Sequence, residues 1–188
     1  MIGFAEKGKG NTAAAVRLAV ETAKRYETDI VAATSTGSTA KALLEEAARQ
    51  GYHGQIVAVG LAYKANENAM SREMQAELAG QGVRVVLAGH ALSGIERGLS
   101  SVFKGLYPAE LIAHVLRMFG AGMKVCAECS LMAADAGAVR TDRPAVAIAG
   151  TGGGADTVVV LTPANSSNVL DMRFHEIICK PLLLPEQA

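Results

Sequence analysis

The residues with the clearest capacity for chemistry are five hydroxyl side chains grouped around one glycine in the six-residue stretch TSTGST. The stretch follows the apolar run Ile30–Ala33 and precedes a segment with helical spacing. Free N–H groups and the helix dipole favour an anion at such a helix start. Ordinary capping is the alternative, but a cap needs only one or two hydroxyls. We therefore predict a phosphate-binding loop, which lacks the lysine of nucleotide-hydrolysing P-loops. Its residues are Thr34, Ser35, Thr36, Gly37, Ser38 and Thr39.

A second glycine-rich segment, GTGGG, begins at Gly150 and follows the apolar run Ala145–Ala149. The dinucleotide-binding fingerprint must open a helix, whereas this segment leads into another apolar run, Thr157 to Leu161. The sequence therefore predicts a hairpin loop. Either the loop is a plain turn, or a ligand lies against its backbone at Gly150 and Thr151.

The dipeptide Gly89-His90 follows a third apolar run, Val83 to Ala88. A histidine at the end of a strand can bind a ligand or act as an acid or base, and a structural role is the alternative. The other three histidines have no partner pattern and are predicted to be surface or packing residues. They are His53, His114 and His175.

Cys126 and Cys129 have CxxC spacing but lie in the middle of a predicted helix. The helix dipole lowers a thiol pKa at a helix start and has little effect at this position. With three cysteines in the chain and no further ligands at zinc spacing, we expect buried, reduced thiols. Lys124, Glu128 and Asp135 lie in the same apolar segment, where they form a buried polar network or line a pocket.

Composition limits the classes of function. The 188 residues suit one domain, half of them are apolar, and 18 basic side chains balance 18 acidic ones. Nucleic-acid binding is not expected, because it needs a basic face and, for single strands, aromatic platforms, whereas aromatics make up only 4%. The apolar region 111–139 is interrupted by charges, and the first residues contain no apolar signal core. We expect a single cytoplasmic domain over residues 1–188, without a membrane partner.

Apolar runs alternate with helical patterns along the chain. The five expected strands cover residues 30–33, 55–59, 83–88, 145–149 and 157–161. The expected helices cover 12–26, 38–50, a segment capped by Asn68 that ends near residue 80, 91–103, 109–119 and 122–135. Strand–helix–strand spacing implies parallel pairing with right-handed crossovers, and the short link after residue 149 implies an antiparallel last strand. The sequence therefore predicts a three-layer α/β/α domain whose mostly parallel sheet has an antiparallel edge.

Residues at the carboxyl ends of parallel strands meet at one edge of such a sheet, where ligands bind. This places the hydroxyl loop, Gly60, Gly89, His90 and Gly150 together. Further along, residues 169–179 form either a sixth strand or an edge arm. The apolar residues Ile177, Ile178 and 182–184 are expected to cover a core edge or a subunit interface, so we predict a homo-oligomer.

Several of these segments together resemble the stand-alone proteins of the pyruvate kinase C-terminal-domain-like family, over nearly the whole chain. They are TSTGSTA, the GH after the third strand, YPAELIAHVLRMFGAGMKV and VAIAGTGGGADTVVVLTPA. The resemblance implies a five-stranded sheet in the order 3-2-1-4-5 with strand 5 antiparallel. It also implies that the hydroxyl loop holds the phosphate of FMN.

The resemblance further suggests where FMN would lie. Gly60, Gly89, His90, Gly150 and Thr151 would line the cleft for its ribityl chain and ring, an inference from position alone. The expected function is therefore FMN binding, with flavin-dependent oxidoreductase activity on an unnamed substrate. The alternatives are a non-catalytic sensor that binds a phosphorylated metabolite and a structural subunit. Kinase activity is not expected, because the chain lacks the barrel domain and the metal-binding carboxylates that phosphoryl transfer needs.

Overall fold

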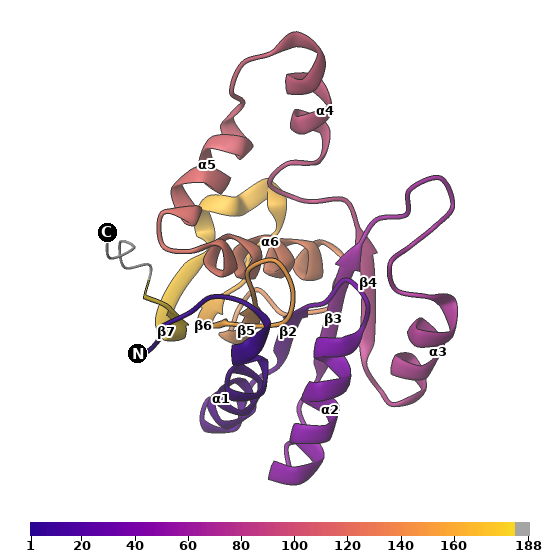
Figure 1. Cartoon of the computed structure of the whole chain (residues 1–188), viewed down its shortest axis with the longest axis vertical. Helices are drawn as coiled ribbons and strands as arrows, with labels where there is room; N and C mark the ends of the chain where they lie inside the picture. Colours follow the sequence, from indigo (N-terminus) through magenta and orange to yellow (C-terminus); the bar gives the residue numbers. More distant parts are fainter. Residues whose placement is uncertain (183–188) are drawn as a thin grey trace.

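The strands of the computed structural model, which describes residues 1–182, form a single mostly parallel sheet (Figure 1). Its order is β1-β7-β6-β5-β2-β3-β4. The strands are β1 (Ile2–Phe4), β2 (Ile30–Ala33), β3 (Ile56–Leu61), β4 (Arg84–Ala88), β5 (Ala145–Ala149), β6 (Thr157–Thr162) and β7 (Arg173–Pro181). The α-helices are α1 (Thr12–Arg25), α2 (Ser38–Gln50), α3 (Arg72–Gly80), α4 (Gly94–Phe103), α5 (Pro108–Arg117) and α6 (Ala121–Asp135). The short 3-10 helices η1 (Lys9–Asn11) and η2 (Ser166–Asp171) complete the described elements.

The mostly parallel α/β architecture is confirmed, but the predicted extent of the sheet is wrong. The five expected strands are neighbours in the order β4-β3-β2-β5-β6, with β6 antiparallel to β5. The sheet continues past β6, because β7 pairs antiparallel with β6, and β1 pairs parallel with β7. The segment near the end of the chain is therefore a strand, and β6 is internal. The three-residue β1 has no recognisable pattern of its own; it pairs with β7, and its Phe4 packs against the main hydrophobic cluster.

The central strands are buried on both faces, as continuous apolar runs predict. Residues 30–32 of β2 are fully buried, and the same is true of the whole of β5. Side chains from α1 and α2 pack on one face of the sheet, and α6 packs on the other. Figure 1 shows these layers, with α4 and α5 extending beyond α6.

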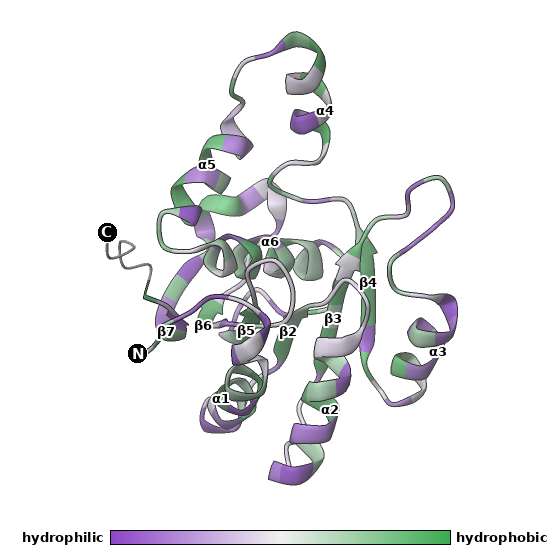
Figure 2. Ribbon diagram, in the orientation of Figure 1, coloured by the Kyte–Doolittle hydropathy of each residue, from purple (hydrophilic) through white to green (hydrophobic). Residues whose placement is uncertain are grey.

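Helix α6 is the most deeply buried helix of the domain. Twelve of its fifteen residues are buried, including two that carry charges. Helix α4 has no buried residue, and part of its ribbon has the green of hydrophobic residues in Figure 2, at the far end of the molecule. No helix within residues 1–182 combines the length and apolar character that crossing a membrane requires.

The start of α3 differs from its prediction. Asn68 does not cap this helix, which begins at Arg72 with Ser71 as its N-cap; the Ser71 hydroxyl accepts a 3.2 Å hydrogen bond from the Met74 amide. Asn68 instead stabilises the preceding loop, where its side-chain oxygen accepts a hydrogen bond from the Met70 amide. An asparagine can form a local turn as readily as a cap.

The end of the chain also contributes to the core. Ile178 is buried and belongs to the main hydrophobic cluster, so the expectation of a covered core edge is confirmed there. Leu182 is 41% exposed. Residues 183 and 184 lie outside the described part of the chain, and the predicted subunit interface stays a prediction.

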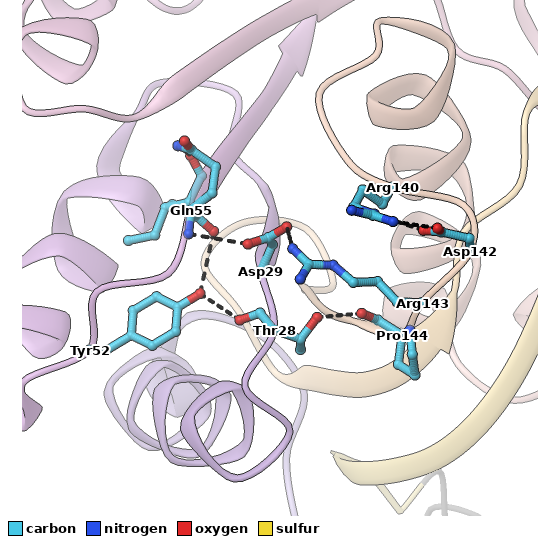
Figure 3. Close-up of polar contacts among 9 residues, drawn as sticks. Thr28, Asp29, Tyr52, Gln55, Arg140, Asp142, Arg143 and Pro144 are labelled. Carbon is cyan, nitrogen blue, oxygen red and sulfur yellow. Dashed lines mark hydrogen bonds and ion pairs between the residues drawn. The ribbon is translucent and has the colours of Figure 1, made fainter.

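Polar contacts align the amino-terminal ends of the strands, opposite the predicted site (Figure 3). The Asp29 carboxylate before β2 pairs with Arg143 before β5 at 2.7 Å and accepts from the amide of Gln55 before β3 at 3.3 Å. The Tyr52 hydroxyl donates to the Thr28 carbonyl at 2.8 Å. These contacts connect the amino-terminal ends of β2, β3 and β5. Because β2 pairs parallel with both β3 and β5, the carboxyl ends of the three strands lie side by side at the opposite end of the sheet.

Candidate functional site

A cavity of about 230 Å³, here called the strand-end cavity, opens at the carboxyl ends of β2, β3 and β5. Seven of the predicted site residues line it: Thr34, Ser35, Ser38, Thr39, Gly60, His90 and Gly150. Four α6 side chains form its opposite wall, and the sequence analysis names only Glu128 among them as a candidate to line a pocket. They are Val125, Glu128, Cys129 and Met132. The structure thus brings most of the predicted residues together, although their chain segments are far apart.

A larger cavity of about 630 Å³, here called the outer cavity, adjoins the first and shares Leu61 and His90 with it. Gly89 lines the outer cavity and not the strand-end cavity. Lys64 and Arg97 also line it. His90 therefore lies at the boundary of two spaces, of which the larger has cationic side chains on its wall.

The hydroxyl loop turns sharply into α2. Gly37 has a left-handed φ of 94°, and a Cβ there would lie 2.5 Å from Met74 Cγ, so glycine is required. The Gly37 amide donates to the Thr34 hydroxyl at 3.0 Å, which gives buried Thr34 a structural role in the turn. Thr36 lies outside the cavity wall and donates to the Ser38 hydroxyl at 3.2 Å.

The first turn of α2 is open to a ligand. The first N–H groups of a helix have no acceptor inside it. Within residues 1–182, no side-chain hydrogen bond caps this turn. Ser35 and Ser38 are exposed beside it and line the strand-end cavity. Backbone donors and hydroxyls therefore converge at this end of the cavity.

The glycine-rich loop between β5 and β6 is held by a residue that the sequence analysis missed. Asp156 is fully buried, and its Oδ2 accepts from the Gly8 amide at 2.8 Å and the Thr151 amide at 3.2 Å. Thr151 thereby supports the loop and does not line the strand-end cavity. A Cβ on Gly154 would lie 2.3 Å from Thr12 Oγ1, so the loop packs closely on the start of α1. Gly150, Gly153 and Gly154 line the cavity with backbone.

A buried ion pair lies behind the cavity wall opposite the hydroxyl loop and contributes Glu128 to that wall. Lys124 and Glu128, one turn apart on α6, are 4% and 1% exposed, and the ammonium group bonds Glu128 Oε2. The same oxygen lies 2.8 Å from His90 Nδ1, and Oε1 accepts the Leu92 amide at 3.1 Å. Both hypotheses for these charges are correct for Glu128, which belongs to a buried network and lines the cavity. Asp135 is separate and accepts the Ser166 amide at 2.9 Å.

The network determines the ionisation of Glu128. Burial alone would raise its pKa, but hydrogen bonds from His90 and Lys124 outweigh burial and lower the pKa from 4.5 to about 2. Glu128 is therefore a carboxylate at every physiological pH. The four-residue spacing of Lys124 and Glu128 is visible in the sequence. The contact between Glu128 and His90, 38 positions away, is not.

We expect this shift to make stability depend on acid pH. Between pH 4.5 and about 2, the unfolded chain binds a proton at Glu128 and the folded chain does not. The free energy of unfolding therefore decreases as the pH is lowered through this window. A shift of this size corresponds to about 3 kcal/mol. Urea unfolding at pH 5 and pH 2.5 measures the loss. Glu128→Gln should lose less stability than the wild-type protein between these two pH values. An equal loss in both proteins would contradict the lowered pKa of Glu128.

The cysteines behave as apolar packing groups. All three are free and buried within the described chain. Burial raises the pKa of Cys126, and it raises the pKa of Cys129 to about 12 and that of Cys179 to about 11. Protonated thiols are weak nucleophiles, so the CxxC pair is not suited to redox exchange. Residues 1–182 contain no cluster of three or more metal-ligating His, Cys, Asp or Glu side chains.

The three remaining histidines lie on the surface, as predicted. Of these, His175 bonds the Thr162 hydroxyl at 2.8 Å. The comparison with protein families adds no assignment, since no family model matches the chain. The site is therefore defined by its geometry: an uncapped helix start, a glycine backbone wall and a histidine backed by a buried ion pair.

Proposed function

We propose that this chain binds FMN at the carboxyl ends of its strands and supports flavin-dependent oxidoreductase chemistry. The observation that carries the proposal is the uncapped first turn of α2, which opens with Ser35 and Ser38 onto the strand-end cavity. A helix start with free donors suits a phosphate ester. The resemblance to the pyruvate kinase C-terminal-domain-like family supports the same placement.

The residues of the site fit such a ligand. The backbone of Gly150 and Gly153 allows close approach, and Val59, Val125 and Met132 offer an apolar wall for a flat ring. Ligand pockets usually measure about 300–1,000 Å³. The strand-end cavity is smaller, so a ligand of this length must continue past His90 into the outer cavity of about 630 Å³. Bound FMN would supply the electron transfer, and the protein would supply orientation and electrostatics.

A second candidate is a non-catalytic sensor for a small phosphorylated metabolite. The observation in its favour is the volume of the strand-end cavity, about 230 Å³, which suits a sugar phosphate without use of the outer cavity. The two candidates share the phosphate position and differ in whether the outer cavity is occupied.

The test compares two flavins that differ only in the phosphate. The purified protein should be yellow, and heating should release FMN that mass spectrometry identifies. Titration of the flavin-free protein should give FMN an affinity at least 100-fold above that of riboflavin, the matched control without phosphate. Reduction of the bound flavin by NADH or NADPH would separate an enzyme from a carrier. A colourless protein that sugar phosphates stabilise and FMN does not would overturn the proposal in favour of the sensor.

A further inference from the structure

His90 lies where the strand-end and outer cavities meet, and its side chain is 42% exposed. Behind it lies the Glu128 carboxylate, which is 1% exposed. A partly exposed imidazole bonded to a buried, charged carboxylate is a typical arrangement for proton transfer. The buried pair below the ring is a costly feature that packing alone does not require.

The hydrogen bond to Glu128 determines which ring nitrogen of His90 carries hydrogen. An ionised carboxylate only accepts, so Nδ1 at 2.8 Å from Oε2 must carry the proton. The neutral ring then has its lone pair on Nε2, for which residues 1–182 provide no hydrogen-bond partner. Nε2 is the ring nitrogen available to a ligand in either cavity.

The charges around the ring suit a base that becomes protonated. From α6, Glu128 faces the ring and balances the imidazolium, while Lys124 keeps that carboxylate ionised. In the outer cavity, Lys64, Glu67 and Arg97 are the charged residues of the wall. The hydroxyl loop on the other side contributes no charge. Two cations against one anion in the outer cavity favour an anionic substrate.

We propose that His90 is the catalytic proton donor and acceptor of this site, acting through Nε2 on a small anionic substrate in the part of the outer cavity that Lys64 and Arg97 line. Glu128 is a positioning residue. In the step, Nε2 accepts a proton from an O–H or N–H group, and the electron pair of that bond stays on the substrate. The imidazolium formed is paired with Glu128 and returns the proton to substrate or solvent. The proposal goes beyond the proposed function and does not require that FMN be the ligand of the strand-end cavity.

Two measurements on the intact chain test this assignment, and the exposed residues His53, His114 and His175 serve as internal controls. Long-range ¹H–¹⁵N NMR should show His90 protonated at Nδ1, with Nε2 free. Diethyl pyrocarbonate, with sites read by mass spectrometry, should modify His90 about tenfold faster than the controls. Saturating FMN should protect His90 at least tenfold and leave the controls unchanged.

The double variant Lys124→Met/Glu128→Leu removes both charges and the acceptor of His90 Nδ1. Checked for folding by circular dichroism, it should lose the tautomer preference and reduce the reaction rate of His90 to that of the controls. A purely packing role for Glu128 would leave both unchanged. If FMN does not bind but the tautomer and the fast reaction persist, the assignment of His90 stands and only the FMN proposal fails. If Nε2 carries the hydrogen in the wild-type protein, or if His90 reacts no faster than the controls, the assignment is overturned.

Discussion

Replacing Glu128 with leucine should destabilise the folded chain by about 3–5 kcal/mol at neutral pH, the usual consequence of removing one partner of a buried ion pair. The substitution leaves the Lys124 ammonium 4% exposed without its carboxylate. It also removes the acceptor of the Leu92 amide. Urea unfolding followed by circular dichroism measures the loss.

The double variant Lys124→Met/Glu128→Leu is the matched control. It removes both charges and keeps similar volumes, so about 2 kcal/mol of the lost stability should return. The unpaired Leu92 amide should still cost about 1–3 kcal/mol. If the double variant is as unstable as Glu128→Leu alone, the loss of stability comes from the shape of the leucine side chain and not from the unpaired charge of Lys124. A single variant of unchanged stability would mean that Lys124 escapes to solvent.

Replacing Ser38 with glutamate should reduce FMN affinity by about 100-fold or more while the fold persists. Ser38 is exposed at the first residue of α2, so the new carboxylate would lie where the phosphate is proposed to bind. Two unit charges 4 Å apart repel by about 4 kcal/mol at an effective dielectric of 20, and each 1.4 kcal/mol is tenfold in affinity. Fluorescence titration with FMN measures the effect.

Two controls separate charge from damage to the fold. Ser38→Ala should change FMN affinity by less than tenfold, since only one hydroxyl is lost. Ser101→Glu adds the same charge on an exposed position of α4 and should leave binding unchanged. Riboflavin, which has no phosphate, should bind wild type and Ser38→Glu alike. Equal FMN affinity in wild type and Ser38→Glu would remove the hydroxyl loop from the site.

Local signals were sufficient for several elements. The bounds of β2, α2 and β5 follow the prediction residue for residue, because each is a continuous apolar run or a helix with a clear start and stop. Gly51, with its left-handed φ of 63°, ends α2 where the sequence places it. The bounds of these elements depend on residues that are close together in the chain. The same holds for the alternation of strands and helices that defines the α/β class.

The edge strand and the anchoring of the loops required long-range contacts. Strand β1 has three residues and exists because β7, near the other end of the described chain, pairs with it. The buried carboxylate of Asp156 connects Gly8 to the glycine-rich loop across 148 positions. Nothing in the local pattern distinguishes this aspartate from an ordinary turn residue.

The candidate site divides in the same way. The sequence alone determined the hydroxyl loop and its position after a strand, because helix starts and apolar runs are short-range features with fixed geometry. Only the tertiary structure decided that His90 contacts Glu128 and that α6 forms the far wall of the cavity. Such contacts depend on how helices cross the sheet, and that crossing is determined by the packing of the whole core.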